Sequence, residues 1–81
     1  MKLLYFASIR EQIGLHEEDV ALPAHIVIIA DLIEWMQSRG AEYQALRSPT
    51  LRVAINQAHV KLDANIADAT EIAFFPPMTG G

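Results

Sequence analysis

The sequence predicts a small α+β domain in which one main helix packs across a mixed sheet of about five strands. Five short segments have the apolar content or the period-two alternation that strands require, and one segment repeats its apolar residues at the helical spacing of three and four. The segments follow one another in the order β, β, α, β, β, β. That order favours a helix and a sheet that each bury one face against the other, and 81 residues suffice for one such domain.

Two strands are expected before the main helix. The apolar run Lys2–Ser8 is typical of a strand, and residues 8–14 then close with one helical turn that ends at a glycine. The second strand is predicted at Glu17–Leu22, where Pro23 ends it. We expect its carboxylates to form a solvated edge rather than an acid–base pair; they are Glu17, Glu18 and Asp19.

The main helix is expected over residues 29–39, because its apolar side chains fall on one stripe: Ile29, Leu32, Ile33 and Met36. Arg39 suits the negative C-terminal end of the helix dipole, and Gly40 suits a left-handed cap. No Ser, Thr, Asp or Asn directly precedes the stripe, so no side-chain N-cap is evident. Trp35 is expected at the half-buried edge of the helix.

Three further strands are predicted after a polar connection that spans residues 40–50. Apolar residues alternate with polar or small residues over 51–56, over 59–62 and over 71–75. This alternation assigns each side chain to one of the two faces of the sheet.

The alternation also predicts an aromatic patch on the outer face of the sheet. Lys2 and Glu71 must face water, so Phe6 and Phe75 lie on the same side and become neighbours if the first and last strands pair. Aromatic side chains grouped outside a core usually mark a docking site. Two alternatives are that residues 40–50 cover this face and that the register differs by one residue.

The composition limits the partners of the chain. A net charge of −4 with only six scattered basic residues argues against nucleic acid and against an anionic membrane surface. No apolar run is long enough to span a bilayer or resembles a signal peptide. There is no cysteine, and the three histidines lack ligand spacing, so no metal site is expected. A cytoplasmic location fits these features best.

The last six residues, 76–81, are expected to form an extended arm on the domain of residues 1–75. Pro76 and Pro77 cannot donate ladder hydrogen bonds, so they end the strand and stiffen the segment. Met78 and Thr79 then project away from the domain, and six extended residues reach at most about 20 Å. Gly80 and Gly81 lack side chains and can enter a channel that is too narrow for other residues.

The carboxylate of Gly81 is the candidate reactive group. It is ionised at cellular pH and is a poor acyl donor, but it can attack the α-phosphate of ATP to give an acyl-adenylate. A sulfur nucleophile that displaces AMP would then give a thiocarboxylate. The chain has no Gly-rich phosphate loop, so ATP is expected on a partner enzyme and no cofactor on this chain. The alternative is a frayed glycine tail with no function.

Four motifs give the chain a family resemblance. The end, "FFPPMTGG", resembles the small subunits of molybdopterin synthase, which are ubiquitin-like β-grasp sulfur carriers. The opening "YFASIREQIG" is similar to that family's aromatic-Ala-x-x-Arg-Glu-x-x-Gly pattern, and "VAINQ" and "EIAFFPP" match as well. The resemblance covers the whole chain.

The resemblance implies a role in molybdenum cofactor biosynthesis. A partner adenylating enzyme would activate Gly81 with ATP, and the resulting thiocarboxylate would enter the large synthase subunit. Sulfur would pass there to cyclic pyranopterin monophosphate and build the molybdopterin dithiolene, with the catalytic residues on the large subunit. The family's assembly is a heterotetramer, and its partner contacts map onto Phe6, Arg10, His59 and Phe75.

Two positions depart from the family pattern. His59 stands where a larger aliphatic residue is common, which makes this part of the patch less apolar. Ala69 and Thr70 replace a frequent Gly-Asp pair, and a positive φ at Ala69 would cost about 1 kcal/mol relative to glycine. Both affect the expected partner affinity or stability, not the arm.

Three other functions stay open from the residues alone. A ubiquitin-like protein modifier would share the chemistry up to the adenylate and would then join Gly81 to target lysines. A thiamine-pathway sulfur carrier shares the Gly-Gly end but not usually Phe-Phe-Pro-Pro. A passive binding module would use the Phe6 and Phe75 patch and would not need Gly80 or Gly81. Arg10 is expected to be a surface ion-pair residue rather than a catalytic one.

Overall fold

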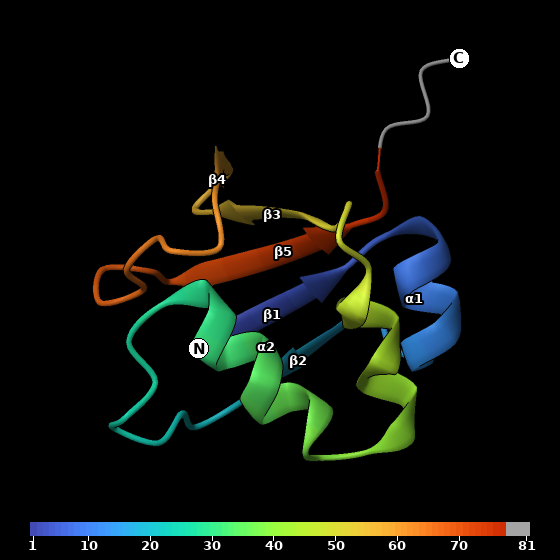
Figure 1. Cartoon of the computed structure of the whole chain (residues 1–81), viewed down its shortest axis with the longest axis horizontal. Helices are drawn as coiled ribbons and strands as arrows, with labels where there is room; N and C mark the ends of the chain where they lie inside the picture. Colours follow the sequence, from blue (N-terminus) through green and yellow to red (C-terminus); the bar gives the residue numbers. More distant parts are fainter. Residues whose placement is uncertain (78–81) are drawn as a thin grey trace.

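A five-stranded sheet with helices packed against one face forms the domain (Figure 1). The computed structural model describes residues 1–77, so Met78, Thr79, Gly80 and Gly81 lie outside the described residues. The strands are β1 (Lys2–Tyr5), β2 (Glu17–Asp19), β3 (Arg52–Ile55), β4 (Ala58–Val60) and β5 (Glu71–Phe75). The helices are α1 (Ala7–Ile13), α2 (Ile29–Gln37) and the 3₁₀ helix η1 (Ala41–Arg47).

The sheet is mixed, with strand order β2-β1-β5-β3-β4. The first and last strands of the chain lie side by side in its centre and are parallel, whereas all other neighbours are antiparallel. The predicted α+β class and the five strands are therefore confirmed. Because β1 and β5 are parallel, the end of β1 lies beside the end of β5, with Tyr5 opposite Phe74.

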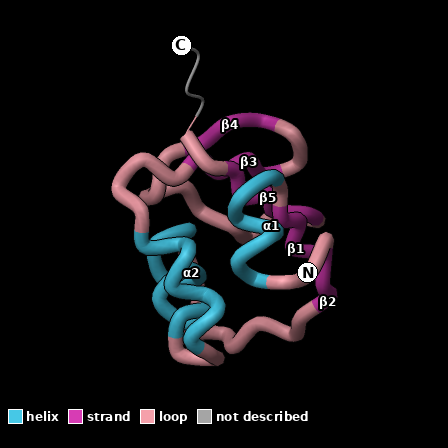
Figure 2. Tube along the Cα trace, turned by 90° about the vertical axis from the view of Figure 1, so that its right-hand side faces the viewer, coloured by secondary structure: helices cyan, strands magenta, loops and turns pink. Residues whose placement is uncertain are grey.

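The core lies between the sheet and the helices. Leu3 and Tyr5 from β1 meet Ile72 and Phe74 from β5, and all four are at most 2% exposed. The predicted stripe of α2 is buried against them, which confirms the periodicity. When the molecule is turned by 90°, α2 lies on one side and the strands run along the other (Figure 2). Each fully buried side chain of this size contributes roughly 1.5–3 kcal/mol.

The first strand is shorter than predicted. It ends at Tyr5 rather than Ser8, because Ala7 has φ 51° and turns the backbone off the sheet into α1. The helical turn that follows does end at Gly14, as predicted. Gly14 has φ 88°, a left-handed conformation that favours glycine, and its N–H donates to the carbonyl of Arg10.

The second strand also ends early, at Asp19 rather than Leu22. Val20 still donates its N–H to the carbonyl of Met1, but the chain then leaves the edge of the sheet. The fourth strand ends at Val60 rather than 62. Beyond it, the carbonyls of Leu62 and Ala64 accept hydrogen bonds from the first N–H groups of α2, which would otherwise lack partners.

The end of α2 differs from the prediction. The helix stops at Gln37 and its cap is Ser38, whereas Gly40 has φ 173° and is extended, so the left-handed cap at Gly40 was wrong. An extended φ is open to any residue, and a Cβ on Gly40 would first meet the carboxylate end of the flexible Glu42 side chain, which can move aside. At the other end, Asp31 accepts hydrogen bonds from the N–H groups of residues 27 and 28 and caps the helix from within its first turn.

The connection after α2 holds the unpredicted helix η1. Its residues Tyr43 and Leu46 are buried in the core cluster, so this segment packs on the helix side of the sheet. It therefore does not cover the outer face, and that alternative is removed. Among the helices of residues 1–77, none combines the length and the apolar content needed to cross a bilayer.

Candidate functional site

Two adjacent rows of side chains on the outer face of the sheet lie near the end of β5, and the strand register defines both. Leu4, Ala73, Ala54 and His59 are successive cross-strand partners and form the first row. The second row begins with Phe6, whose N–H donates to the carbonyl of Phe74 at 3.2 Å, and continues through Phe75 to its register partner Arg52. This row lies where β5 ends and the chain leaves the sheet.

Three rings of this face form an aromatic cluster: Phe6, Phe75 and His59. The rings of Phe6 and Phe75 are stacked, with centroids 4.8 Å apart and planes 8° apart. His59 is tilted against Phe75 with a centroid distance of 5.8 Å. The predicted adjacency of Phe6 and Phe75 is confirmed, and Phe6 remains 41% exposed. A stacked aromatic pair left open to solvent is typical of a docking surface.

Backbone geometry holds Phe6 beside Phe75. Phe6 is extended, with φ −124° and ψ 151°, and so it continues the pairing of β1 with β5 by one residue. Its carbonyl accepts the N–H groups of Ile9 and Arg10, which starts α1 directly behind it. The positive φ of Ala7 makes this abrupt change possible, at a cost of about 1–2 kcal/mol. Strain of this kind is often retained where it positions a functional side chain.

Arg10 is separate from the aromatic cluster in its contacts. Its Nη1 lies 3.4 Å from Nδ1 of His16, and both side chains are exposed. The structure thus brings together three of the four predicted interface residues and directs the guanidinium of the fourth toward His16. Their role in partner binding stays a prediction.

The base of the arm lies next to the aromatic cluster. Pro76 and Pro77 directly follow Phe75 and are half-buried. Both line a hollow of about 310 Å³ between α1 and η1, and Pro77 also borders a hollow of about 440 Å³ beside β3 and β4. The predicted chemistry of Gly80 and Gly81, and the predicted projection of Met78 and Thr79, concern residues outside those described.

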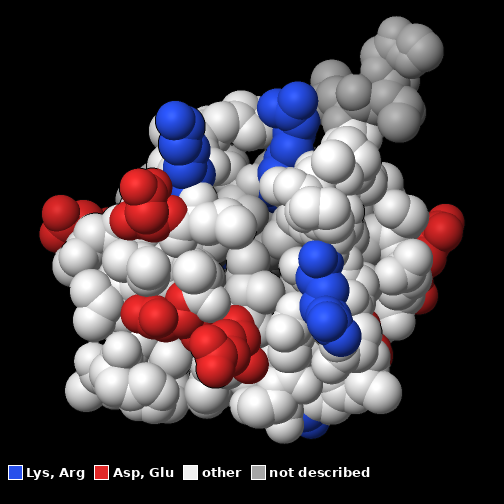
Figure 3. All heavy atoms as spheres, in the orientation of Figure 1, with Lys and Arg blue, Asp and Glu red and all other residues white. Residues whose placement is uncertain are grey.

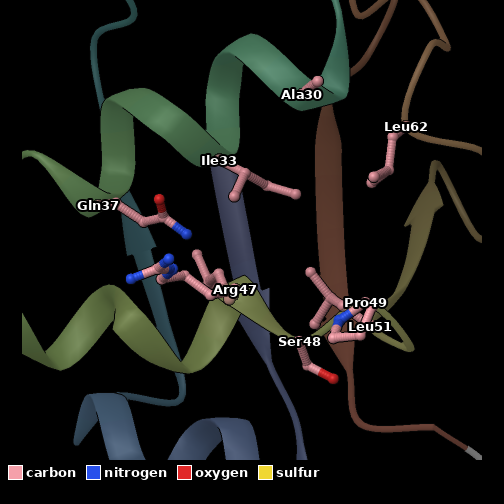
Figure 4. A pocket seen from close by; sticks show the side chains of 9 residues that line it. Ala30, Ile33, Gln37, Arg47, Ser48, Pro49, Leu51 and Leu62 are labelled. Carbon is pink, nitrogen blue, oxygen red and sulfur yellow. The ribbon is translucent and has the colours of Figure 1, made fainter.

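A further pocket of about 300 Å³ lies between α2, η1 and the segment after β4 (Figure 4). Ile33, Leu51 and Leu62 point into it, and Gln37 and Arg47 lie toward one end. None of its nine lining residues is a histidine, an aspartate or a glutamate. The pocket therefore holds no acid–base pair. Within residues 1–77 no three side chains gather as metal ligands would, and the expectation that the chain binds no metal stays a prediction.

The acidic run 17–19 behaves differently from the prediction, because Glu18 points inward. Its carboxylate accepts hydrogen bonds from Tyr5 Oη at 2.8 Å and from Tyr43 Oη, and it pairs with Arg39 at 3.0 Å. The guanidinium of Arg39 also lies over the rings of Trp35 and Tyr43. The solvated-edge interpretation was wrong for Glu18, although Trp35 is half-buried as predicted.

This network shifts the pKa values of its members. Burial alone would raise the pKa of Glu18, but hydrogen bonds from Tyr43, Tyr5 and Arg39 hold it below the ordinary value. Burial and the hydrogen bond to Glu18 raise the pKa of Tyr43 to about 12 and that of Tyr5 further. Glu18 is therefore a charged, fully partnered group at the edge of the core, with a structural rather than a catalytic role.

The turn at Ala69 shows no strain. Within residues 1–77 the only non-glycine residues with positive φ are Ala7, Asn56 and Gln57, so the cost considered for Ala69 does not arise. The turn is held instead by Asn56, whose Oδ1 accepts hydrogen bonds from the N–H groups of Thr70 and Glu71. Asn56 is the Asn of the "VAINQ" motif, and its contacts give that position a structural role at the start of β5.

Comparisons with known proteins agree over the full length of the chain. A family model described as the ThiS family matches residues 3–81. The molybdopterin synthase sulfur carrier subunit of Escherichia coli (strain K12) is 37% identical over 82 residues, covering 100% of this chain and 99% of the relative. A putative molybdopterin converting factor, subunit 1, from Pyrococcus furiosus has a TM-score of 0.74 at 26% identity over 95% of each chain.

A fold likeness extends to a more distant protein. The crystal structure of SAMP1 from Haloferax volcanii has a TM-score of 0.78 at 20% identity and covers 100% of this chain and 98% of that chain. At that identity the likeness supports the fold alone. Together these matches confirm the ubiquitin-like β-grasp architecture that the motifs implied.

Proposed function

This chain belongs to the ThiS family, and from that premise we propose that it is the sulfur carrier subunit of a molybdopterin synthase. The observation that carries the proposal is the aromatic cluster at the base of a Pro-Pro arm that leads to Gly80 and Gly81. With this arrangement a partner protein can bind the aromatic cluster while the arm enters the interior of that partner. The 37% identity to a molybdopterin synthase sulfur carrier subunit supports sulfur transfer as the role of the arm.

Activation takes place at the carboxylate of Gly81. A carboxylate oxygen attacks the α-phosphorus of ATP on a partner activating enzyme, and pyrophosphate leaves. Hydrosulfide, supplied by the sulfur source, then attacks the acyl carbon, and AMP leaves with the electrons of the broken C–O bond. Loss of the proton on sulfur gives the thiocarboxylate on Gly81. No side chain of this domain takes part in either step, because the activating enzyme binds the nucleotide.

Sulfur transfer takes place inside the large synthase subunit. There the thiocarboxylate sulfur forms a C–S bond with a carbon of cyclic pyranopterin monophosphate, and the oxygen bound to that carbon leaves with the electrons of its C–O bond. Water then attacks the acyl carbon of the resulting thioester, so the sulfur stays on the pterin and Gly81 is released as a carboxylate. Two such transfers build the dithiolene, with the catalytic residues on the large subunit. Six residues carry Gly81 up to about 20 Å from the end of β5, which suits a deep site on another protein.

The same proposal places the protein in the cytoplasm as part of a heterotetramer, with one small subunit at each end of a large-subunit dimer. Phe6 and Phe75 supply the apolar centre of the contact, and His59 makes its edge more polar. Burial of exposed aromatic area is the main source of affinity in such contacts.

A chain extended by one alanine after Gly81 tests the proposal. In a synthase reconstituted with the large subunit, activating enzyme, ATP and a sulfur source, the extended chain should make no molybdopterin. A chain with one alanine added before Met1 is the matched control and should keep activity. Both variants should unfold at nearly the same denaturant concentration as the unaltered chain. The C-terminal addition touches none of the described contacts, and the N-terminal addition affects only the ammonium that contacts Asp19 and the carbonyl of Val20. Full activity of the C-terminally extended chain would contradict the proposal.

The products of these reconstituted reactions also distinguish a sulfur carrier from a protein modifier. A modifier would appear as isopeptide-linked adducts of Gly81 on lysines of other proteins. A carrier would appear only as the free thiocarboxylate and carboxylate forms.

A further inference from the structure

Two cations extend the second row of the outer face beyond the aromatic cluster. Building on the proposed function, we propose that Arg52 and Lys61 select an acidic surface on the large synthase subunit, beside the opening that admits the arm. Carboxylates of the large subunit would contact Arg52 and Lys61. An apolar patch beside them on the same subunit would contact Phe6 and Phe75.

The register places the two cations together. Arg52 begins β3, and Lys61 directly follows Val60, the last residue of β4 and the register partner of Val53, so both cations lie at the same end of the β3–β4 ladder. Arg52 is also the register partner of Phe75. Both cations are exposed, and both line the hollow of about 440 Å³ that Pro77 borders. The second row therefore runs from stacked rings to a pair of positive charges.

The pair lacks an acidic partner among the described residues. The ion pairs of residues 1–77 join Asp19 to the N-terminus, Glu17 to Lys2 and Glu18 to Arg39. Two exposed cations that border the same hollow repel each other. The chain has ten acidic residues and a net charge of −4, yet none neutralises this position. An arrangement that costs the free domain stability is relieved when a partner supplies the negative charge.

The space-filling view shows where the charged side chains lie. In the orientation of Figure 3, Lys and Arg side chains stand along the upper edge, over β3 and β4, and others lie lower, in the middle and at the bottom of the view. Acidic side chains lie toward the two sides and in the lower middle, and some lie just below the left end of the upper edge. A cationic margin next to an apolar centre matches the usual layout of a protein interface, with a buried apolar core and a charged rim.

Carboxylates fit this position better than the phosphate of the adenylate. In the proposed function the adenylate forms on Gly81, and six residues would hold that group up to about 20 Å from Phe75 when the arm is extended into a partner. Arg52 pairs with Phe75 and therefore lies at the opposite end of the arm from the phosphate. A partner protein, by contrast, must surround the base of the arm in order to receive it. The geometry thus points to acidic side chains on the protein that holds the domain.

Charge reversal tests the inference through binding to the large subunit of the same organism. The variants are Arg52→Glu, Lys61→Glu and the double variant. Arg47→Glu is the matched control, since Arg47 is also exposed and in no ion pair of residues 1–77, but lies on η1 on the helix side. Each single reversal should weaken binding about tenfold at low salt, mainly through a slower association rate, and the loss should shrink at high salt.

The outcomes separate the two proposals. Binding of Arg52→Glu and Lys61→Glu that equals that of Arg47→Glu would overturn the inference and leave the carrier function intact. Failure of the unaltered chain to bind the large subunit would contradict the carrier function and, with it, this inference. Thermal unfolding of each variant excludes misfolding, and replacement of a partner carboxylate by lysine should restore binding of the reversed variants.

Discussion

Two charged regions of the molecule differ in how their charges are neutralised. On the helix side, Glu18 is enclosed by Tyr5, Tyr43 and Arg39, and each of these groups has a partner. At the end of the β3–β4 ladder, Arg52 and Lys61 border the same hollow and take part in no ion pair of residues 1–77. The Glu18 network is neutralised within the domain, whereas in the proposed complex a second protein neutralises Arg52 and Lys61.

The aromatic side chains show the same division. Phe74 stacks on Tyr5 with centroids 5.9 Å apart and is fully buried, whereas its neighbour Phe75 stacks on the exposed ring of Phe6. Adjacent residues of one strand thus lie in the core and on the proposed recognition surface. Substitutions in the two regions should therefore change stability and partner binding one at a time.

The largest contrast is expected between Phe74→Ala and Phe75→Ala. Removal of the buried ring should cost about 3–5 kcal/mol of unfolding free energy, because it leaves a cavity in the core. Removal of the half-buried ring should cost about 1 kcal/mol and weaken binding to the large subunit instead. Urea denaturation gives the first quantity and titration calorimetry the second. Equal stability losses in the two variants would remove the distinction between the faces.

Glu18→Gln should have the next largest effect. The change keeps the shape of the side chain but removes the charge that Arg39 and two tyrosine hydroxyls contact, so about 1–3 kcal/mol should be lost. The matched control is Glu17→Gln on the adjacent exposed position, which contacts only Lys2 and should change stability by less than about 0.5 kcal/mol. If both variants unfold alike, the Glu18 network does not stabilise the fold.

Stability should depend on pH through the same carboxylate. The pKa of Glu18 is lowered in the folded state, so its contribution is fully present above the ordinary glutamate pKa. That contribution is lost as the pH falls through the lowered pKa. Denaturation midpoints measured between neutral and acidic pH should therefore decrease more steeply for the unaltered chain than for Glu18→Gln. Parallel curves would show that the carboxylate has the same pKa in the folded and unfolded states.

The smallest effect is expected at the β3–β4 turn, which connects the charged strands of the outer face. Gln57 has φ 73°, a conformation in which glycine avoids the cost paid by other residues, so Gln57→Gly should stabilise the domain by about 1 kcal/mol. Ala58→Gly, one residue later and inside β4, should instead destabilise it. Thermal unfolding of both variants checks the opposite signs, and partner affinity should stay unchanged in Gln57→Gly.

Periodic features of the fold could be predicted from the sequence because they depend on local spacing. The stripe on α2 and the meeting of Phe6 with Phe75 both follow from side-chain direction in helices and strands. Alternation even separates Glu18 from Glu17, since neighbouring strand residues face opposite sides. It also assigns Arg52 and Lys61 to the face of Phe75, and this signal was available without coordinates.

Contacts between distant segments could not be predicted in this way. Tyr43 reaches Glu18 across 25 residues, and nothing in the local pattern around either residue indicates the other. The extended backbone of Gly40 and the helix η1 depend on how the chain returns across the core, not on the preference of glycine for a left-handed cap. The early ends of β1 and β2 likewise follow from packing, which overrides the apolar runs.

Intact-mass analysis of the chain after incubation with the activating enzyme, ATP and a sulfur source tests the carrier function most directly. A sulfur carrier should gain a mass equal to the replacement of one oxygen by one sulfur, located at Gly81, and a chain that ends in an added alanine should not. An unchanged mass under conditions in which ATP is consumed, or a mass that reports attachment to another protein, would contradict it.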